Sequence, residues 1–273
     1  MKKISFARIF NFAVILLFAF IMLAPYMWMI TTSLKPRNMM GEPPYLIPTS
    51  FRFENYKIAW EAAPFLRYYI NTLIVALGVI ASRIIFASLA AYSFAIMKFK
   101  GRDFLFLLFL GTMMIPFQSI IIPSYQIARD FNWFNTFQVL IVPRMVDAFS
   151  IFLLRQNFVS IPKDYLDAAK MDGCNDWQTL WRIVFPLAQP TVLTMSLFTF
   201  LFIWNDFLWP LLVANAEKMR VIQVGLQAFS GRYQVEWTYM MAGTVMATIL
   251  PILIFFIAQK QFISGIMKSG IKG

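Results

Sequence analysis

Histidine is missing from this chain of 273 residues, and cysteine occurs only once, at Cys174. Without histidine, the chain lacks the commonest general base, the His-paired serine and cysteine nucleophiles and the His-ligated zinc sites. A single cysteine supports neither a disulfide framework nor a cysteine metal cluster. We therefore predict no catalytic residues, no metal site and no redox chemistry in this chain.

Charged residues are also scarce. They make up 14% of the sequence, whereas 60% is hydrophobic, including 30 Phe and 17 Met. Soluble domains are about one quarter charged, so this composition predicts a chain whose solvent is lipid. The formal net charge is +11, but Lys and Arg are scattered between long apolar runs and form no basic face. Nucleic acid is therefore not expected as a partner.

Six apolar runs are long enough to cross a hydrocarbon core, which needs about 20 residues of helix. The first follows a charged start like that of a signal peptide, but it is too long for the usual hydrophobic region and no A-x-A site follows. We therefore read it as an uncleaved span. The predicted fold is all-α, a polytopic integral membrane protein formed as a single transmembrane domain over residues 1–273. The predicted transmembrane helices are 9–31, 69–96, 104–125, 138–157, 190–213 and 239–259.

The distribution of Lys and Arg indicates the orientation of these spans. The segments on the side of the termini hold 13 of the 24 basic residues, and the segments on the opposite side hold 9, although these are longer in total. The clearest part of this bias is the tight turn between the second and third spans, with Lys98, Lys100 and Arg102. Because cytoplasmic loops are enriched in basic residues, we expect both termini in the cytoplasm.

The segment 158–190 departs from the apolar pattern around it and reads as two short helices. Pro162 suits the first turn of a helix of about ten residues, and Gly173 stands where that helix should stop. Asp164 and Asp167 lie toward its N-terminal end, where the helix dipole favours negative charge.

A second helix is predicted directly afterwards, because Asn175 and Gln178 form the pattern of a capping box. Its apolar residues recur at helical spacing before Pro186 ends the run. Physical chemistry alone leaves two interpretations of this hairpin open, a surface element lying on the bilayer or an element that docks on a partner. The apolar residues of the second helix are Trp177, Leu180, Trp181 and Val184.

The spacing within the hairpin resembles the E-A-A-x3-G-x9-I-x-L-P loop of binding-protein-dependent ABC importers. The match runs through Asp167-Ala168-Ala169, Gly173 and Ile183-Val184-Phe185-Pro186, with Asp in place of Glu and Phe in place of Leu. Five further strings, in order, resemble the carbohydrate-uptake branch of that family, and specifically the smaller second permease of maltose-type systems. They are Asn71-Thr72-Leu73-Ile74, Ala90-Ala91-Tyr92-Ser93-Phe94, Met113-Met114-Ile115-Pro116, Trp204-Asn205-Asp206-Phe207-Leu208-Trp209-Pro210 and Ser269-Gly270-Ile271-Lys272-Gly273.

This resemblance implies a permease subunit of an ATP-driven sugar importer in a bacterial cell membrane, which forms half of the translocation pathway and is not an enzyme. The hairpin would be the coupling helix that docks on an ATPase subunit. The loop 211–238 is where such relatives contact their binding protein; its simpler interpretation is an ordinary connection between spans. The coupling residues would be Asp164, Asp167, Ala168, Ala169, Gly173, Ile183 and Pro186.

The implied partners are a second permease in a heterodimer, an ATP-binding cassette ATPase dimer and an extracellular solute-binding protein, in addition to membrane lipid. No G-x-x-x-x-G-K-[ST] pattern occurs in the sequence, so no backbone cradle for ATP phosphates is visible. We therefore expect no cofactor in this chain, with ATP and magnesium bound by the partner subunits.

Four ionisable residues lie within predicted spans, where charge is costly and usually faces a bundle interior or a wet cavity. The helical rise places Arg83 about 21 Å and Asp206 about 24 Å from the cytoplasmic ends, which allows the two to meet. Arg144 and Asp147, three residues apart, can neutralise each other locally. Structural pairing is the simpler interpretation for Arg83, and a role facing the solute is the alternative.

The fifth span combines aromatic faces with hydrogen-bonding groups, the mixture that sugars need. Trp209, near the end of this span, is read instead as an interfacial anchor. The alternative function is an ion-coupled secondary transporter working through Asp206 or Asp147, although no internal repeat typical of such carriers is visible. The candidate substrate-pathway residues are Asn71, Arg83, Trp204, Asn205 and Asp206.

Overall fold

The computed structural model describes residues 6–36, 50–229 and 236–270, and every regular element within them is helical. Three helices are long and apolar enough to cross a membrane, and three bent helix pairs qualify when each pair is counted together. This gives up to six spans and confirms the predicted all-α membrane fold. The three continuous helices are α1 (Phe6–Ser33), α3 (Phe65–Ala95) and α14 (Trp237–Gly270).

The chain divides into two compact units, and each unit is built from two separate stretches of the sequence. Unit 1 contains Met1–Phe65 and Gly225–Leu250, and unit 2 contains Leu66–Val224 and Pro251–Gly273. The candidate site lies entirely in unit 2, so the description concentrates there.

Unit 1 holds α1, α2 (Glu54–Glu61), η6 (Leu226–Phe229) and the first part of α14. α1 exposes apolar side chains along its length, as expected of a helix surrounded by lipid. α2 is tied to the end of α1 because the Asn55 side-chain amide donates to the carbonyl oxygens of Ser33 (2.8 Å) and Lys35 (3.1 Å).

Unit 2 is organised around α3. Gly78 allows α3 to approach the helix that begins at Phe137, because an added Cβ would lie 2.8 Å from Ile141 Cδ1. Between α3 and η6, the chain forms α4 (Arg102–Gly111), η2 (Thr112–Met114), α5 (Phe117–Asp130), α6 (Phe137–Ile141), η3 (Val142–Arg144), α7 (Ala148–Val159), α8 (Lys163–Met171), α9 (Asp176–Thr179), η4 (Leu180–Val184), α10 (Phe185–Leu187), α11 (Gln189–Trp204), α12 (Leu208–Val213), η5 (Glu217–Met219) and α13 (Ile222–Gly225).

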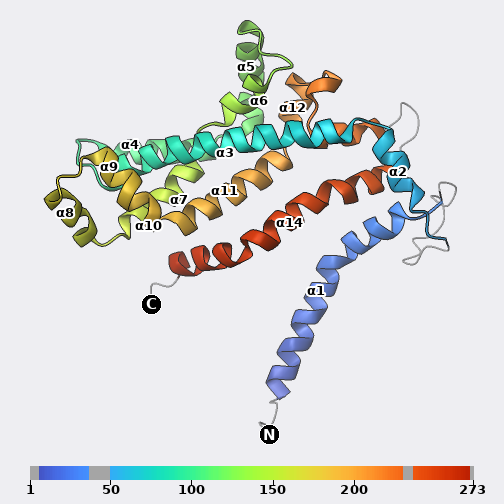
Figure 1. The fold of residues 1–273 in the computed structure, drawn as a ribbon, viewed down its shortest axis with the longest axis horizontal. Coiled ribbons are helices and arrows are strands. Elements are labelled where there is room, and N and C mark those ends of the chain that lie inside the picture. Colours follow the sequence, from blue (N-terminus) through green and yellow to red (C-terminus); the bar gives the residue numbers. More distant parts are fainter. Residues whose placement is uncertain (1–5, 37–49, 230–235, 271–273) are drawn as a thin grey trace. The chain divides into compact units, whose positions relative to one another are not determined.

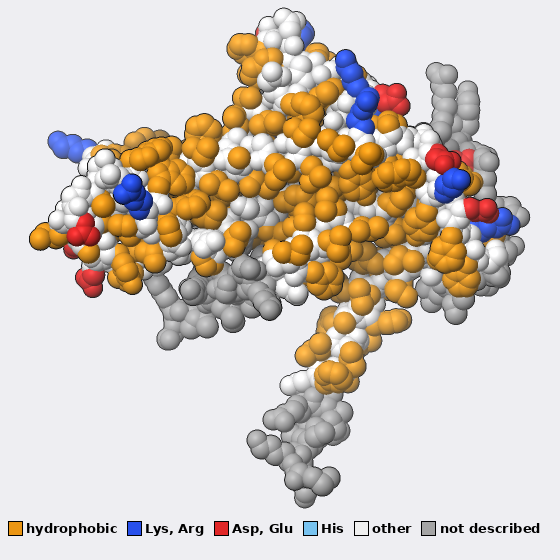
Figure 2. Space-filling model, viewed as in Figure 1, with side chains coloured by type: hydrophobic (Ala, Val, Ile, Leu, Met, Phe, Trp, Pro, Cys, Tyr) orange, Lys and Arg blue, Asp and Glu red, His pale blue; other side chains and the backbone are white. Residues whose placement is uncertain are grey.

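The core of unit 2 joins helices that are distant in the sequence. Buried side chains from α3, α4, α7, η4 and α11 form one hydrophobic cluster, so the polar hairpin segment shares a core with four of the predicted spans. Figure 2 shows hydrophobic side chains over the middle of α3. The cluster includes Ala91, Tyr92, Phe106, Leu154, Leu180, Val184 and Val192.

The third predicted span, 104–125, is wrong as a continuous helix. The segments Arg102–Met114 and Phe117–Asp130 meet at 94°. Ile115 is extended (φ −85°, ψ 110°), as is common before proline, and Pro116 cannot donate a backbone hydrogen bond to continue the helix.

The fourth and fifth predicted spans are also interrupted. Between η3 and α7, the helix axis turns by 44° at residues 145–147. In the fifth span, α11 ends at Trp204 and α12 begins only at Leu208. The Asn205 side-chain amide donates to the Leu201 carbonyl at 2.8 Å, a local bond that competes with helix continuation.

Candidate functional site

The first helix of the hairpin, α8, has the predicted termini. Gly173 follows it with φ +75°, the left-handed conformation that glycine adopts without strain. The Gly173 N–H donates to the Lys170 carbonyl (3.0 Å) and the Cys174 N–H to the Ala169 carbonyl (2.9 Å), which is the Schellman arrangement. The prediction that Gly173 ends this helix is confirmed.

The second helix begins with the predicted capping box. The Gln178 N–H donates to Asn175 Oδ1 (2.9 Å), and the Asn175 N–H donates to Gln178 Oε1 (3.0 Å). The helix then runs through α9, the π-helical η4 and α10 to Leu187, one residue beyond the predicted end at Pro186. Proline is tolerated in the first turn of a new segment, and the chain then bends by 80° into α11.

The second helix is anchored in the core of unit 2. Leu180 and Val184 are buried in the hydrophobic cluster, whereas Trp177 is 61% exposed. At its start, beside the end of α3 (Figure 1), the Tyr92 hydroxyl donates to Asp176 Oδ1 at 3.0 Å. These contacts seat the hairpin firmly on helices of the bundle.

The coupling candidates on α8 divide into an exposed face and a buried side. Asp164, Asp167 and Ala168 are exposed, but Ala169 is 1% exposed and packs inside unit 2. Ala169 therefore offers no surface to a partner. Beyond α8, Ile183 is half-buried and Pro186 is exposed.

The four charged residues within the spans form two ion pairs. Arg83 Nη1 lies 3.1 Å from Asp147 Oδ1, and Arg144 Nη2 lies 3.0 Å from Asp206 Oδ2. The first contact has ion-pair distance without hydrogen-bond alignment, since Asp147 Oδ1 has no hydrogen-bond partner. Arg83 Nε also donates to the Arg144 carbonyl at 2.9 Å, which links the two pairs.

This pairing contradicts both predicted pairs, Arg83 with Asp206 and Arg144 with Asp147. The physical reason is the bend between η3 and α7. Asp147 is extended (φ −144°, ψ 149°) and caps α7 by accepting the Ser150 N–H at 3.1 Å, so it does not lie one helical turn from Arg144. Arg144 instead faces the break between α11 and α12.

Aromatic rings enclose the Arg144 guanidinium. Its Cζ lies 4.1 Å from the centre of the Phe117 ring and 5.1 Å from that of Phe202. Arg144 Nε has no hydrogen-bond partner, because Asp206 contacts only Nη2. The ring faces add a cation–π stabilisation of the guanidinium charge. The described residues include no group of three or more His, Cys, Asp or Glu side chains that could hold a metal ion.

The remaining substrate-pathway candidates have different surroundings. Trp204 is 2% exposed and packs against Tyr69 and Phe200, whereas Asn205 is exposed at the break after α11. Trp209 is 1% exposed, and its indole N–H donates to the Val139 carbonyl at 2.8 Å. The interpretation of Trp209 as an interfacial anchor is therefore wrong.

Asn71 holds the segment that follows α12. Its side-chain amide donates to the carbonyl oxygens of Lys218 (3.0 Å) and Arg220 (2.9 Å), and Thr72 Oγ1 accepts the Ile222 N–H at 2.9 Å. This part of the loop 211–238 is thus built into unit 2. Residues 230–235 of that loop lie outside the described residues.

Sequence reasoning missed the contacts that hold the hairpin in place. Tyr92 belongs to a string that the resemblance singled out, but nothing in the pattern gave it a partner 84 residues away. Arg155 is similar: its Nη2 lies 3.5 Å from Asp103 Oδ1, and its Nε donates to the Phe94 carbonyl at 3.2 Å.

An all-helical chain with up to six broken or continuous spans, and a capped hairpin seated on them, is the architecture of a polytopic membrane protein. The family described as binding-protein-dependent transport system inner membrane component matches residues 83–268. The chain belongs to this family. It is a permease component of a transport system and not an enzyme.

Several known proteins are similar to this chain over nearly its full length. The chain is 34% identical to the arabinooligosaccharides transport system permease protein AraQ of Halalkalibacterium halodurans, covering 93% of each chain. It is 29% identical to the lactose transport system permease protein LacG of Rhizobium radiobacter, covering 96% of this chain and 95% of that one. The structure also matches a chain of a bacterial ABC transporter involved in the import of the acidic polysaccharide alginate. The TM-score is 0.83 and the sequence identity 25%, and the match covers 96% of this chain and 100% of that chain.

Proposed function

We propose that this chain is a permease subunit of an ATP-driven, binding-protein-dependent sugar importer and forms half of its translocation pathway. Membership of the transport family supports the class, and relatives named for arabinooligosaccharides and lactose support sugar as the cargo. The observation that carries the coupling role is the hairpin itself, an exposed helix fixed to the core of the bundle.

The packing of the hairpin against the bundle supports a role in coupling the ATPase to the transmembrane helices. The exposed side of α8, with Asp164, Asp167 and Ala168, is the surface offered to an ATPase subunit. Force applied there reaches η4, whose Leu180 and Val184 share a core with α3, α7 and α11. A close-packed core transmits displacement because it has little free volume to absorb it.

The partners in this proposal are a second permease, an ATPase dimer that binds ATP and magnesium, and an extracellular solute-binding protein. The chain spans a bacterial cell membrane with both termini in the cytoplasm, because the hairpin must face the compartment that supplies ATP. ATP-driven closure of the ATPases would draw the coupling helices together and alternate the access of the cavity between the two sides.

Within the spans, Asp147 and Asp206 each lie against an arginine, which supports a structural role for both carboxylates. Asn205 is the one substrate-pathway candidate with an exposed side chain, and it is the best position for contact with a sugar. An ion-coupled carrier would instead require one carboxylate to load and release its ion during transport.

The experiment is sugar uptake by the assembled transporter reconstituted in vesicles. Uptake should require ATP on the side of the hairpin and persist when a protonophore collapses the proton gradient. Uptake without ATP that stops with the protonophore would identify a carrier and refute the proposal.

Ala168→Trp tests the docking surface within the same assay. A bulky side chain at this exposed position should abolish ATP-dependent uptake, while the chain still folds and inserts. Lys57→Trp is the matched control, because Lys57 is 78% exposed on α2 and should tolerate the same bulk. Normal uptake by the Ala168→Trp assembly would show that α8 does not dock on the ATPase.

A further inference from the structure

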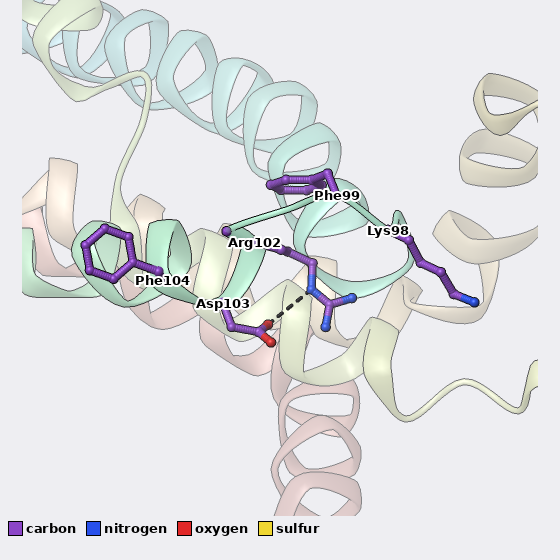
Figure 3. Close-up of a pocket in the computed structure, with 6 residues that line it drawn as sticks. Lys98, Phe99, Arg102, Asp103 and Phe104 are labelled. Atoms are coloured by element: carbon purple, nitrogen blue, oxygen red, sulfur yellow. Dashed lines mark hydrogen bonds and ion pairs between the residues drawn. The ribbon is translucent and has the colours of Figure 1, made fainter.

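The turn between α3 and α4 borders an open cavity of about 460 Å³. α3 has 31 residues and therefore extends about 46 Å, close to the ~40–45 Å thickness of a bilayer with its headgroups. The turn at its end thus reaches the depth of the lipid phosphates. Figure 3 shows the residues that line the cavity, which are Lys98, Phe99, Gly101, Arg102, Asp103 and Phe104.

The cavity carries an excess of positive charge. Its one carboxylate, Asp103, is balanced because Oδ1 lies 3.1 Å from Arg102 Nε (Figure 3). The same oxygen lies 3.5 Å from Arg155 Nη2. Lys98 and Lys100 are exposed, and neither has an ion-pair partner among the described residues. Lys98 lines the cavity, whereas Lys100 lies two residues further along the turn and does not line it, so the turn as a whole offers two unpaired ammonium groups to an anion.

The surface beside these lysines is apolar. On α4, Phe104 and Leu107 are 65% and 66% exposed, and Phe99 in the turn is 42% exposed. Basic side chains next to an exposed apolar helix match a ligand whose anionic head is joined to hydrocarbon chains. A free phosphate would use the lysines but would gain nothing from the apolar surface.

We propose that this cavity and the turn beside it form a binding site for the headgroup of an anionic phospholipid, with Lys98 from the cavity and Lys100 from the turn holding the phosphate and the acyl chains lying along α4. Because Arg155 links Asp103 to the Phe94 carbonyl at the end of α3, a lipid held here stabilises the same end of the bundle that carries the hairpin. The site does not depend on which solute the chain helps to transport.

The test is lipid binding by the full-length chain in detergent, measured by native mass spectrometry. Dioleoylphosphatidylglycerol is titrated against dioleoylphosphatidylcholine, with inorganic phosphate as a third arm. The native chain should prefer phosphatidylglycerol. Replacing both lysines, Lys98→Gln with Lys100→Gln, should weaken its binding by on the order of tenfold or more, because each basic residue near an anionic surface contributes about fivefold.

The matched control is Lys163→Gln with Lys170→Gln, which removes the same charge from exposed positions on α8. It should leave phosphatidylglycerol binding unchanged. An equal loss in both double variants, or equal binding of the two lipids by the native chain, would overturn the proposal. Displacement of the lipid by millimolar inorganic phosphate would assign the cavity to free phosphate and overturn the lipid assignment.

A second variant tests the apolar half of the site. Phe104→Gln keeps both lysines but makes the exposed surface beside them polar. This variant should bind phosphatidylglycerol several-fold more weakly, and inorganic phosphate should not change that binding. Unchanged binding of phosphatidylglycerol would show that the acyl chains do not lie there.

Discussion

Replacing Asp206 with Asn should destabilise the chain by about 3–5 kcal/mol, the usual cost of leaving one member of a buried ion pair alone. The Arg144 and Asp206 side chains are 11% and 13% exposed, and their charged atoms are 3.0 Å apart. The variant keeps the size of the side chain but removes its charge. The Phe117 and Phe202 rings that remain near the guanidinium supply on the order of 1 kcal/mol each and do not replace a carboxylate.

The exposed pair Arg129 and Asp130 provides the control. Their charged atoms are 3.1 Å apart, but the side chains are 64% and 66% exposed, so Asp130→Asn should cost less than about 1 kcal/mol. The two substitutions are chemically the same and differ in burial. Transport by the assembled importer should likewise fall far more with Asp206→Asn than with Asp130→Asn.

The assay is the temperature at which the detergent-purified chain loses its monodisperse size-exclusion peak. Asp206→Asn should lower it by on the order of 10 °C. The double variant Arg144→Met with Asp206→Asn should recover most of this loss, because no unpaired charge remains. Equal shifts for Asp206→Asn and Asp130→Asn, or a double variant less stable than Asp206→Asn alone, would refute the reasoning.

Two further predictions concern the hairpin and the fifth span. Gly173→Val should leave insertion intact but reduce coupled uptake, because a β-branched residue at φ +75° costs at least about 1–2 kcal/mol and loosens the end of α8. Gly111→Val, at φ −56° with open space around it, is the control, and normal uptake with Gly173→Val would count against the hairpin's role. Trp209→Phe should cost about 1–3 kcal/mol in thermal stability, because it leaves the buried Val139 carbonyl without its donor. Trp177→Phe at an exposed position should cost almost nothing, and equal effects would indicate that the indole bond does not matter.

The sequence by itself determined the features that depend on neighbours a few residues away. Three of the six apolar runs form continuous helices, and the capping box of Asn175 with Gln178 and the helix end at Gly173 also appear in the structure. Each follows from local spacing, since backbone caps form between residues two to five apart. The resemblance of the hairpin spacing also led to the transport family that the comparisons confirm.

Tertiary structure decided which distant groups meet. The bends after η3 and after α11 direct Arg144 toward Asp206 and leave Asp147 to Arg83, a pairing that counting residues along straight helices does not give. The same holds for Trp209, which the bundle buries against the Val139 carbonyl. A break in a helix redirects every side chain beyond it. The direction of a break depends on packing between helices, and the residue spacing along one helix does not predict this packing.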